Sequence, residues 1–245
     1  MIIENSSQPF LYKNNDKLEL LYCYADHPVD LFFGNSFSIR PWKIKNYSFD
    51  TEQSSELPTQ RFHEDFGRVI IEASPSIAHD NNILKLCWTA GFSNGKNSPI
   101  QFHLCSMDIG NTINDLSNFQ ILEKAHCGAI INGSLIFKLE DDNPEEPLMV
   151  KALGSTQAST FTIDNLDLYV VNKITPIFNS DSFIIGGINL ENINVSYVID
   201  KDYRVVSQIK NQYNYDVNKC SIYEDKLSYS VSVQESKKVV IENIG

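Results

Sequence analysis

The sequence predicts an all-β protein: a single five-bladed β-propeller over residues 1–245, closed by pairing of its N- and C-terminal strands. Three observations indicate this fold. Short segments alternate apolar and polar residues with the two-residue period of half-buried strands, and helical periodicity is almost absent. Turns rich in Asn, Asp and Gly separate these segments. One hairpin-like unit recurs five times along the chain.

The recurring unit consists of a small residue or proline, a short apolar strand, a polar turn and a longer strand with aromatic residues. Its first strands are expected at Pro9 to Tyr12, Pro75 to Ala78, Gly128 to Ile131, Pro176 to Phe178 and Cys220 to Tyr223. Successive starts lie 66, 53, 48 and 44 residues apart. This spacing leaves room for two more strands per unit, which gives the four-stranded sheet of a propeller blade.

The outer strands can be assigned in two of the units. We expect them at Val29 to Phe33 and Trp42 to Phe49 in the first unit, and at Val195 to Ile199 and Arg204 to Ile209 in the fourth. The last unit ends one strand short. Pairing of Ile2-Ile3 with Val239-Val240 would supply the missing strand and cover exposed strand edges. The alternative fold is a two-sheet sandwich with a coincidental repeat.

The least regular part of the chain is Asp50 to His63, which is expected to connect the first two blades. It is longer than a plain connection needs. Long connections on a rigid scaffold often carry function, because they vary while the scaffold holds them in place. A tolerated surface insertion explains the same length equally well.

The net charge of −11 argues against several classes of partner. A nucleic-acid-binding protein needs a basic face that replaces the counterions of the phosphates, so no nucleic-acid partner is expected. No cluster of Lys and Arg interrupts the acidity, which makes an anionic membrane surface an equally poor partner. No run of roughly 18 apolar residues occurs, so no membrane insertion is expected.

The N-terminal segment Met1 to Asn5 has neither a basic start nor a long apolar run, so no signal peptide is expected. The five cysteines are odd in number and never form a CxxC pair, which argues against a disulfide framework and against a zinc site. We expect buried thiols in the cytoplasm or another reducing compartment. The acidic run Glu140 to Glu146 is expected to be a solvated hairpin tip rather than a calcium site. No cofactor and no metal are expected.

The segment Ser106 to Ile113 resembles the Asp box of sialidases and related propellers, Ser-x-Asp-x-Gly-x-Thr-Trp, and differs only at its last position. It follows an expected strand, Ile100 to Cys105. The resemblance implies a hairpin between the third and fourth strands of a blade, in which Asp108 and Thr112 hydrogen-bond turn amides and Gly110 has a positive φ. In that family the box lies away from the active site, so it assigns no function.

A second resemblance covers Ala73 to Trp88, where Ala-Ser-Pro-Ser-Ile, a polar turn and a longer strand are similar to a blade of the arabinanase- and xylosidase-type glycoside hydrolases. The resemblance implies five blades and an axial pocket, into which that family points an Asp from just before the equivalent Pro. Its chemistry needs a carboxylic acid of raised pKa and a second carboxylate across the sugar. In this chain the residues before the five unit starts are Gln8, Ser74, Cys127, Thr175 and Lys219, none of which is a carboxylate.

The densest polar and aromatic segment is Arg61 to Arg68, which is expected near an axial mouth of the propeller. Glu64 or Asp65 together with Glu72 would form the acid and base of a hydrolase. His63 could serve as the base in place of a carboxylate.

The same segment could instead bind a ligand. Arg61 and Arg68 would hold an acidic sugar or a carboxylate through forked hydrogen bonds, unless neighbouring acids already pair with them. Three more candidate ligand-binding residues are Gln8, Trp88 and His126. Gln8 and His126 precede inner strands, and the ring of Trp88 can stack on a sugar or pack in the core.

The sequence therefore favours carbohydrate binding at the axial mouth formed by the inner-strand starts and residues Asp50 to Arg68, with a sugar or glycan as the ligand. Two alternatives stay open. One is a glycoside hydrolase or related sugar-active enzyme that uses the carboxylates between residues 61 and 72. The other is a protein-interaction scaffold that presents its acidic rim to a protein partner.

Overall fold

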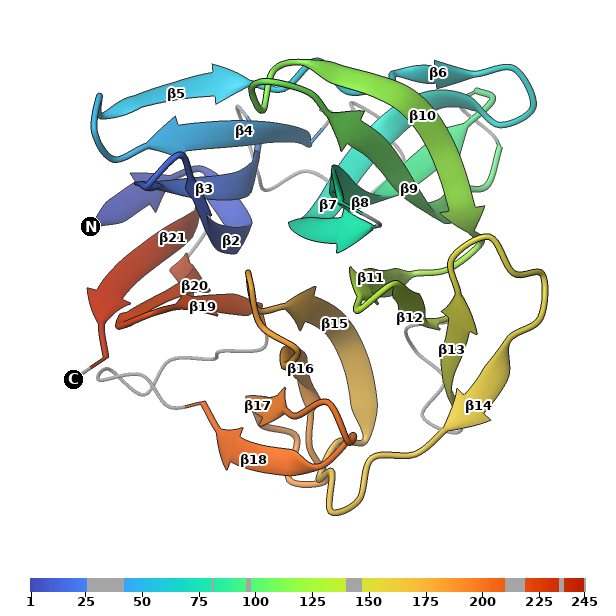
Figure 1. The fold of residues 1–245 in the computed structure, drawn as a ribbon, viewed down its shortest axis with the longest axis vertical. Coiled ribbons are helices and arrows are strands. Elements are labelled where there is room, and N and C mark those ends of the chain that lie inside the picture. Colours follow the sequence, from blue (N-terminus) through green and yellow to red (C-terminus); the bar gives the residue numbers. More distant parts are fainter. Residues whose placement is uncertain are drawn as a thin grey trace.

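The computed structural model describes residues 1–25, 42–80, 82–95, 98–139, 147–209, 219–233 and 236–244. The regular elements of these residues are strands, and they form five antiparallel sheets around a central axis (Figure 1). Each sheet is one blade, and the blades follow one another around the axis in chain order. The prediction of a five-bladed propeller is confirmed, and the two-sheet sandwich is excluded.

The first four blades each contain four consecutive strands. The first blade consists of β2 (Ser6–Asn14), β3 (Lys17–Tyr24), β4 (Lys43–Ser48) and β5 (Gln53–Glu56). The second consists of β7 (Gly67–Asp80), β8 (Ile83–Ser93), β9 (Gln101–Ile109) and β10 (Leu116–Glu123), with the short β6 (Phe62–His63) on the other edge of β7. The third consists of β11 (Cys127–Ile131), β12 (Ser134–Lys138), β13 (Leu148–Ala152) and β14 (Ser159–Phe161). The fourth consists of β15 (Val170–Pro176), β16 (Phe183–Ile188), β17 (Asn194–Ile199) and β18 (Val205–Gln208).

The fifth blade joins the two ends of the chain. It consists of β19 (Cys220–Tyr223), β20 (Lys226–Val233), β21 (Ser236–Asn243) and the N-terminal β1 (Ile2–Glu4). Ile2 pairs with Val240 and Ile3 pairs with Val239, as the sequence predicts. The amide of Val239 also donates to Ser6 Oγ at 3.0 Å, which ties β21 to the start of β2.

The hydrophobic core lies between the blades. Clusters of buried apolar side chains fill all five spaces between neighbouring blades. Between the first and second blades, for example, Phe10 and Leu21 pack with Leu86 and Trp88. The inner strands therefore lie between apolar neighbours on both faces, and the five residues of β11 are all buried.

One expectation about the first blade is untested and one needs correction. The predicted strand Val29 to Phe33 lies outside the described residues. The fourth strand is β5, which lies inside the segment Asp50 to His63 that was expected to be irregular. That expectation was wrong because β5 reads Gln-Ser-Ser-Glu and is exposed along its whole length. A strand without a buried face has no apolar alternation by which the sequence could reveal it.

The inner strand of the fourth blade also differs from the prediction. β15 ends at Pro176, where the predicted strand Pro176 to Phe178 begins. The prediction was wrong because proline has two different places in these blades. Pro9 and Pro75 lie inside their strands, beside breaks in the register, whereas Pro176 is the last paired residue of its strand. The outer strands β17 and β18 agree with the prediction.

The segment that resembles an Asp box lies at the β9–β10 hairpin, as predicted. Its hydrogen bonds differ from the expected ones. The carboxylate of Asp108 accepts bonds from Lys85 Nζ at 2.6 Å and from Asn118 Nδ2 at 2.7 Å, which are side chains and not turn amides. A turn amide, that of residue 111, donates to Asp115 Oδ2 at 3.1 Å. The φ of Gly110 is not positive, so the turn is held by Asp115 rather than by the expected box geometry.

Candidate axial ligand site

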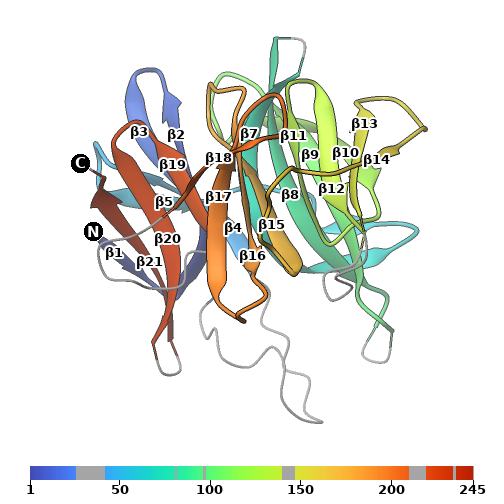
Figure 2. The ribbon, with the colours of Figure 1, turned by 90° about the horizontal axis from the view of Figure 1, so that it is seen from below.

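A pocket of about 210 Å³ opens on the axis where the inner strands begin. All five blades line it: Gln8 belongs to the first blade, Ser74 to the second, His126 to the third, Asn172 to the fourth, and Lys219 and Lys237 to the fifth. In Figure 2 this face of the propeller is at the bottom, opposite the β2–β3 and β7–β8 hairpin turns at the top. The pocket is therefore the axial mouth that the repeat predicts.

A larger cavity of about 410 Å³ lies at the opposite end of the axis. The turns of the inner hairpins line it, in the segments Ile77 to His79, Ile130 to Gly133 and Pro176 to Asp181. The described lining residues of this cavity bring together one histidine and one carboxylate, and no lysine. The smaller pocket gathers more ionisable and hydrogen-bonding groups, and for this reason we take it as the candidate site.

Bulges in three inner strands shape the mouth of this pocket. The pairing register shifts at Gln8 in β2, at Ser74 in β7 and at Asn172 in β15, and all three residues line the pocket. Gln8 and Ser74 have φ values of 54° and 50°. Such left-handed conformations cost non-glycine residues roughly 1–3 kcal/mol, and strain of this kind is concentrated at functional sites.

Gln8 connects three blades at the pocket. Its Oε1 accepts hydrogen bonds from the backbone amide of Ser74 and, at 3.3 Å, from Ser74 Oγ. The Cys23 thiol lies 3.8 Å from the same oxygen. The amide of Gln8 donates to Ser230 Oγ of the fifth blade at 2.8 Å. The first, second and fifth blades are thus held together at the rim of the pocket.

Glu72 supplies the one carboxylate among the described residues of the pocket wall, and its side chain is fully buried. Its Oε2 accepts a bond from the Ile44 amide at 3.0 Å and lies 3.3 Å from Arg61 Nη1. The Thr59 hydroxyl donates to Oε1. Burial raises the pKa of Glu72, although the charge of Arg61 and the bond from Thr59 act in the opposite direction. Both oxygens are therefore engaged in connecting β7 to the first blade.

Two lysines lie near the Cys23 thiol on the axial side. Burial raises the pKa of Cys23 to about 12, and the positive charges of Lys173 and Lys219 oppose this rise. Lys173 is itself buried, and its ammonium donates to the carbonyl oxygen of Pro9 at 3.3 Å. Burial lowers the pKa of Lys173 to about 8, and the neighbouring charge of Lys219 contributes to this fall.

The pocket lining also includes a third lysine and aromatic rings. The ammonium of Lys237 lies 5.5 Å from the ring centre of Trp42, and burial lowers the pKa of this lysine. Phe102 and His126 pack against each other with ring centres 4.7 Å apart. All four residues line the pocket.

Two side-chain oxygens of the pocket wall, Thr89 Oγ1 and Asn172 Oδ1, are buried and have no hydrogen-bond partner within the described part of the chain. A buried polar atom without a partner costs roughly 1–3 kcal/mol. Hydroxyl groups of water or of a ligand in the pocket can remove that cost.

The segment Arg61 to Arg68 was expected near the axial mouth, but only Arg61 meets the pocket wall, through Glu72, and residues 62–68 lead away from it along β6 and the start of β7. The first two residues of β7 pair with β6, and roughly 20 Å of extended strand separate Arg68 from Ser74. The ring of His63 lies near Phe119 of the outer strand β10, with 6.3 Å between ring centres. The expectation was wrong because β7 starts eight residues earlier than the repeat predicts.

The structure therefore does not bring the predicted carboxylates together. Glu64, Asp65 and Arg68 are exposed, and neither they nor Arg61 and His63 line the pocket. Arg61 instead bridges the carboxylates of Glu56, at 3.1 Å, and Glu72.

Of the other candidate residues, Gln8, Glu72 and His126 line the pocket and Trp88 does not. Trp88 is 1% exposed and belongs to the core between the first and second blades, so it cannot stack on a ligand.

Four residues that line the pocket were not predicted from the sequence as ligand-binding residues: Asn172, Lys219, Lys237 and Trp42. Asn172 was missed because the fourth inner strand was placed after it. The position of Lys219, just before the fifth unit, was a usable signal, whereas no sequence pattern marks Lys237 in the last strand of the blade.

Within the described ranges, no group of three or more His, Cys, Asp or Glu side chains is arranged to hold a metal ion. The same residues include no helix that is long and apolar enough to span a membrane. The five cysteines are all described; they are buried and form no disulfide.

Comparison with known proteins found no matching family model and no matching curated protein. Solved structures do match. A GH43_1 enzyme from Xanthomonas citri, complexed with xylotriose, has a TM-score of 0.57 at 10% identity, over 98% of this chain and 87% of that chain. The RS223 β-xylosidase has a TM-score of 0.58 at 11% identity, over 97% and 92%. A β-1,2-mannobiose phosphorylase from Listeria innocua, complexed with β-1,2-mannobiose, has a TM-score of 0.53 at 11% identity, over 99% and 91%.

Matches at this level of identity establish the fold. The structures in question are sugar-active enzymes, and their coverage shows that the likeness extends over all five blades. The chain therefore shares the five-bladed propeller fold of GH43 xylosidases and of a mannobiose phosphorylase, as the resemblance in its sequence implies.

Proposed function

We propose that the protein binds a sugar in the axial pocket between Gln8, Ser74, Asn172 and the fifth-blade lysines. The observation that carries this proposal is the pair of buried oxygens of Thr89 and Asn172, which have no hydrogen-bond partner within the described chain and lie in a pocket lined by polar groups from five blades. A sugar presents hydroxyl groups on several sides at once, which suits such a ring of donors and acceptors.

The aromatic wall supports the same proposal. Phe102 and Trp42 line the pocket, and aromatic faces pack well against the C–H faces of a sugar ring. Two of the structurally similar enzymes are described with sugars, xylotriose and β-1,2-mannobiose. This likeness of fold agrees with a sugar ligand.

The proposal is tested by glycan-array screening followed by calorimetric titration of the monosaccharides that give a signal. We expect Asn172→Ala to weaken binding about tenfold, because one amide that can contact two hydroxyl groups is lost. Asn243→Ala, at an exposed position on β21 away from the pocket, is the matched control and should bind like the wild type. Equal affinities of the two variants for every sugar that binds would contradict an axial site.

Hydrolysis is the second candidate function, because Glu72 combines a raised pKa with a position in the pocket wall. A raised pKa is typical of the acid in glycoside hydrolysis, but the reaction also needs a second carboxylate, roughly 5–9 Å away. The described residues of the wall supply none. The binding proposal therefore expects no turnover.

A panel of chromogenic glycosides distinguishes the two functions. Release of the chromophore by the wild type, lost in a folded Glu72→Gln variant, would establish hydrolysis and overturn a purely binding role. The absence of release, together with measurable binding of the same glycosides, supports binding.

A further inference from the structure

Two histidines and three phenylalanines form a cluster in the second blade, outside the lining of the axial pocket. His103, on β9, packs against Phe66 with 4.4 Å between ring centres and against Phe92 with 5.7 Å. His63 stacks on Phe66 at 4.9 Å and lies 6.3 Å from Phe119 of β10. The β6–β7 hairpin therefore packs two ring side chains, those of residues 63 and 66, against the body of the blade.

The imidazole of His103 is buried without a hydrogen-bond partner. The residue is 5% exposed, and neither Nδ1 nor Nε2 has a partner in the described part of the chain. A neutral imidazole has one donor and one acceptor, so both hydrogen-bonding positions of this ring are unsatisfied. Unsatisfied buried groups of this kind are rare in native structures and require an explanation. Aromatic surroundings tolerate the neutral ring far better than a charged one.

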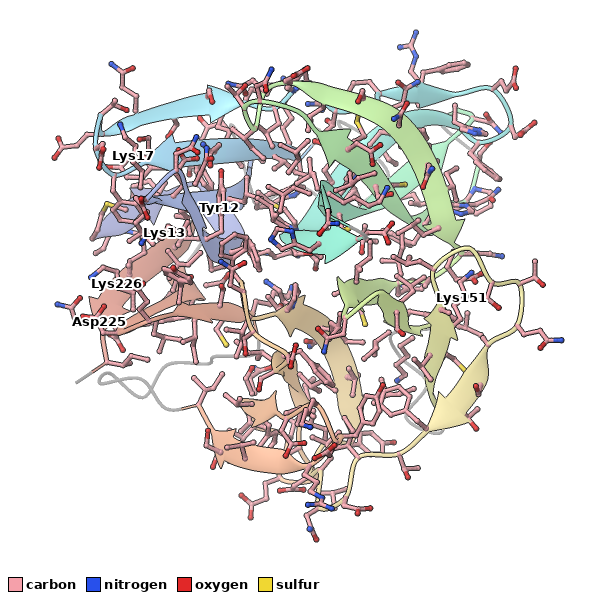
Figure 3. The ribbon with its side chains drawn as sticks, in the orientation of Figure 1. Tyr12, Lys13, Lys17, Lys151, Asp225 and Lys226 are labelled. Carbon is pink, nitrogen blue, oxygen red and sulfur yellow. The ribbon has the colours of Figure 1, made fainter. Side chains whose placement is uncertain are left out.

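The charges that act on His103 oppose its protonation on balance. Burial lowers the pKa of His103, and the positive charges of Lys124 and of protonated His63 lower it further. Glu123 acts in the opposite direction. Its carboxylate, however, is already paired at 2.6 Å with Lys151, which Figure 3 labels on β13 of the third blade.

The acids on the other elements around His103 are engaged elsewhere or exposed to solvent. Glu72 lies two strands from His103 in the same row of the sheet. Its carboxylate pairs with Arg61 at 3.3 Å, and Glu56 on β5 of the first blade pairs with the same guanidinium at 3.1 Å. The two acids of the β6–β7 turn, Glu64–Asp65, are exposed. A protonated His103 would thus be a buried cation without a paired anion among the described residues.

The hairpin that packs on His103 has few other attachments. β6 has two residues, which pair only with the start of β7, and the amide of Val69 donates to the carbonyl oxygen of Arg61 at 3.0 Å. Phe62 is 54% exposed and adds little packing. A short two-stranded hairpin is marginally stable by itself, and segments with few buried contacts open most readily. The packing of His63 and Phe66 on the blade therefore holds the hairpin in place.

We infer that residues 62–66 form an acid-sensitive flap, which opens from the second blade when His103 takes up a proton. Opening brings the imidazolium into water, which solvates it, and sacrifices the packing of Phe66. The closed flap keeps His103 neutral, so the open form binds more protons. Closure is therefore strongest above about pH 6.5, the ordinary pKa of histidine, and weakens as the pH falls below it. The flap follows Arg61, which holds Glu72 in the pocket wall, but the inference does not depend on what the pocket binds.

The inference is tested by hydrogen exchange of peptides covering residues 62–69 at pH 7.5 and pH 5.0, corrected for the intrinsic exchange rates. We expect the opening constant of the wild type to rise at least fivefold, and at most about thirtyfold, which is the limit for a histidine of ordinary pKa in the open form. His103→Phe keeps a ring in the cluster without a titratable nitrogen, and its rise should stay below twofold. His103→Leu is the second variant if the larger ring does not fold. His79→Phe makes the same change at an exposed histidine and should retain the rise of the wild type.

Each other outcome overturns a defined part of the inference. An opening constant of the wild type that is the same at both pH values would overturn the acid sensitivity. A rise of equal size in a folded variant without His103 would overturn the role of this residue. Loss of protection in all five blades at the same pH would show global acid unfolding and would overturn a local flap. None of these results depends on sugar binding, so the inference and the proposed function can fail separately.

Discussion

At the scale of single residues, two buried ionisable side chains at the axial site, Glu72 and Lys173, have different kinds of partner. Glu72 is held by Ile44, Thr59 and Arg61, and its role is to join two blades beside the pocket. Lys173 has a backbone carbonyl as its partner and titrates well below an ordinary lysine. The sequence does not predict that either side chain is buried. No pattern distinguishes Glu72 from the exposed acids Glu64 and Asp65, or Lys173 from the exposed lysines.

Truncation of Glu72 tests the structural role of its carboxylate. We expect Glu72→Ala to lower the free energy of unfolding by roughly 3–5 kcal/mol, because the buried amide of Ile44, the Thr59 hydroxyl and the charge of Arg61 lose their acceptor. Glu64→Ala changes an exposed carboxylate of the same segment and should cost less than about 0.5 kcal/mol. Urea unfolding followed by circular dichroism measures both, and similar losses would contradict the assignment.

Replacement of Lys173 has a predicted pH dependence. Between pH about 8, the pKa in the folded protein, and 10.5, the ordinary value, the unfolded chain binds more protons at Lys173 than the native protein does. Lys173 therefore makes the free energy of unfolding rise with pH in this window, and it costs stability below it. We expect Lys173→Met to be more stable than the wild type at pH 7, by roughly 1–3 kcal/mol.

The measurement is urea unfolding of both proteins at pH 7 and at pH 10. The stability difference between Lys173→Met and the wild type should be smaller at pH 10, where the native amine is neutral. A difference that stays constant between the two pH values would show that Lys173 titrates normally.

At the scale of the elements, the strands that follow the recurring hairpin pattern can be predicted from the sequence, and the strands that depart from it cannot. The period of the inner hairpins identifies five blades, and the apolar ends of the chain identify the closure between β1 and β21. Two strands escape this reasoning: β5, which has no buried face, and β15, whose proline ends the strand instead of standing at a bulge. The position of the site depends on these details. Asn172 was not predicted because β15 starts several residues earlier than expected, and the early start of β7 places residues 62–68 far from the pocket.

Removal of residues 1–4 tests the closure of the ring. The truncation deletes β1 and leaves the edge of β21 unpaired. We expect a clear decrease in thermal stability and concentration-dependent aggregation, because an unpaired edge strand is a template for other chains. Ile2→Ser changes the same strand at a side chain that is 60% exposed and should leave the melting temperature nearly unchanged. An unaltered melting temperature in the truncated protein would argue that the ring does not need this strand.

At the scale of the whole molecule, five apolar interfaces between blades surround an axis that ends in a pocket lined by polar side chains. The fold is shared with solved structures of a GH43_1 enzyme and a β-xylosidase, while the described pocket wall lacks the two carboxylates that glycoside hydrolysis needs. The sequence indicates this departure, because no carboxylate precedes any of the five unit starts. The sequence does not mark Lys237 as a pocket residue, because Lys237 lies in β21, the third strand of its blade along the chain, and not before an inner strand.

The two tryptophans lie in different environments, the axial pocket and the core between blades, so their fluorescence can distinguish the two. Trp42 lines the pocket and Trp88 lies in the core. We expect ligand binding to change the tryptophan fluorescence of the wild type and of Trp88→Phe, but not that of Trp42→Phe. If the signal instead depended on Trp88, the ligand would have to act through the core between the first and second blades.

The most direct measurement is a crystal structure of the protein with a sugar that gives a signal in the glycan-array screen. We expect the sugar on the axis at the start of the inner strands, with its hydroxyl groups near Asn172 and Thr89. A sugar bound along the outer edge at Arg61 to Arg68, with the axial pocket holding only water, would contradict the assignment of the site.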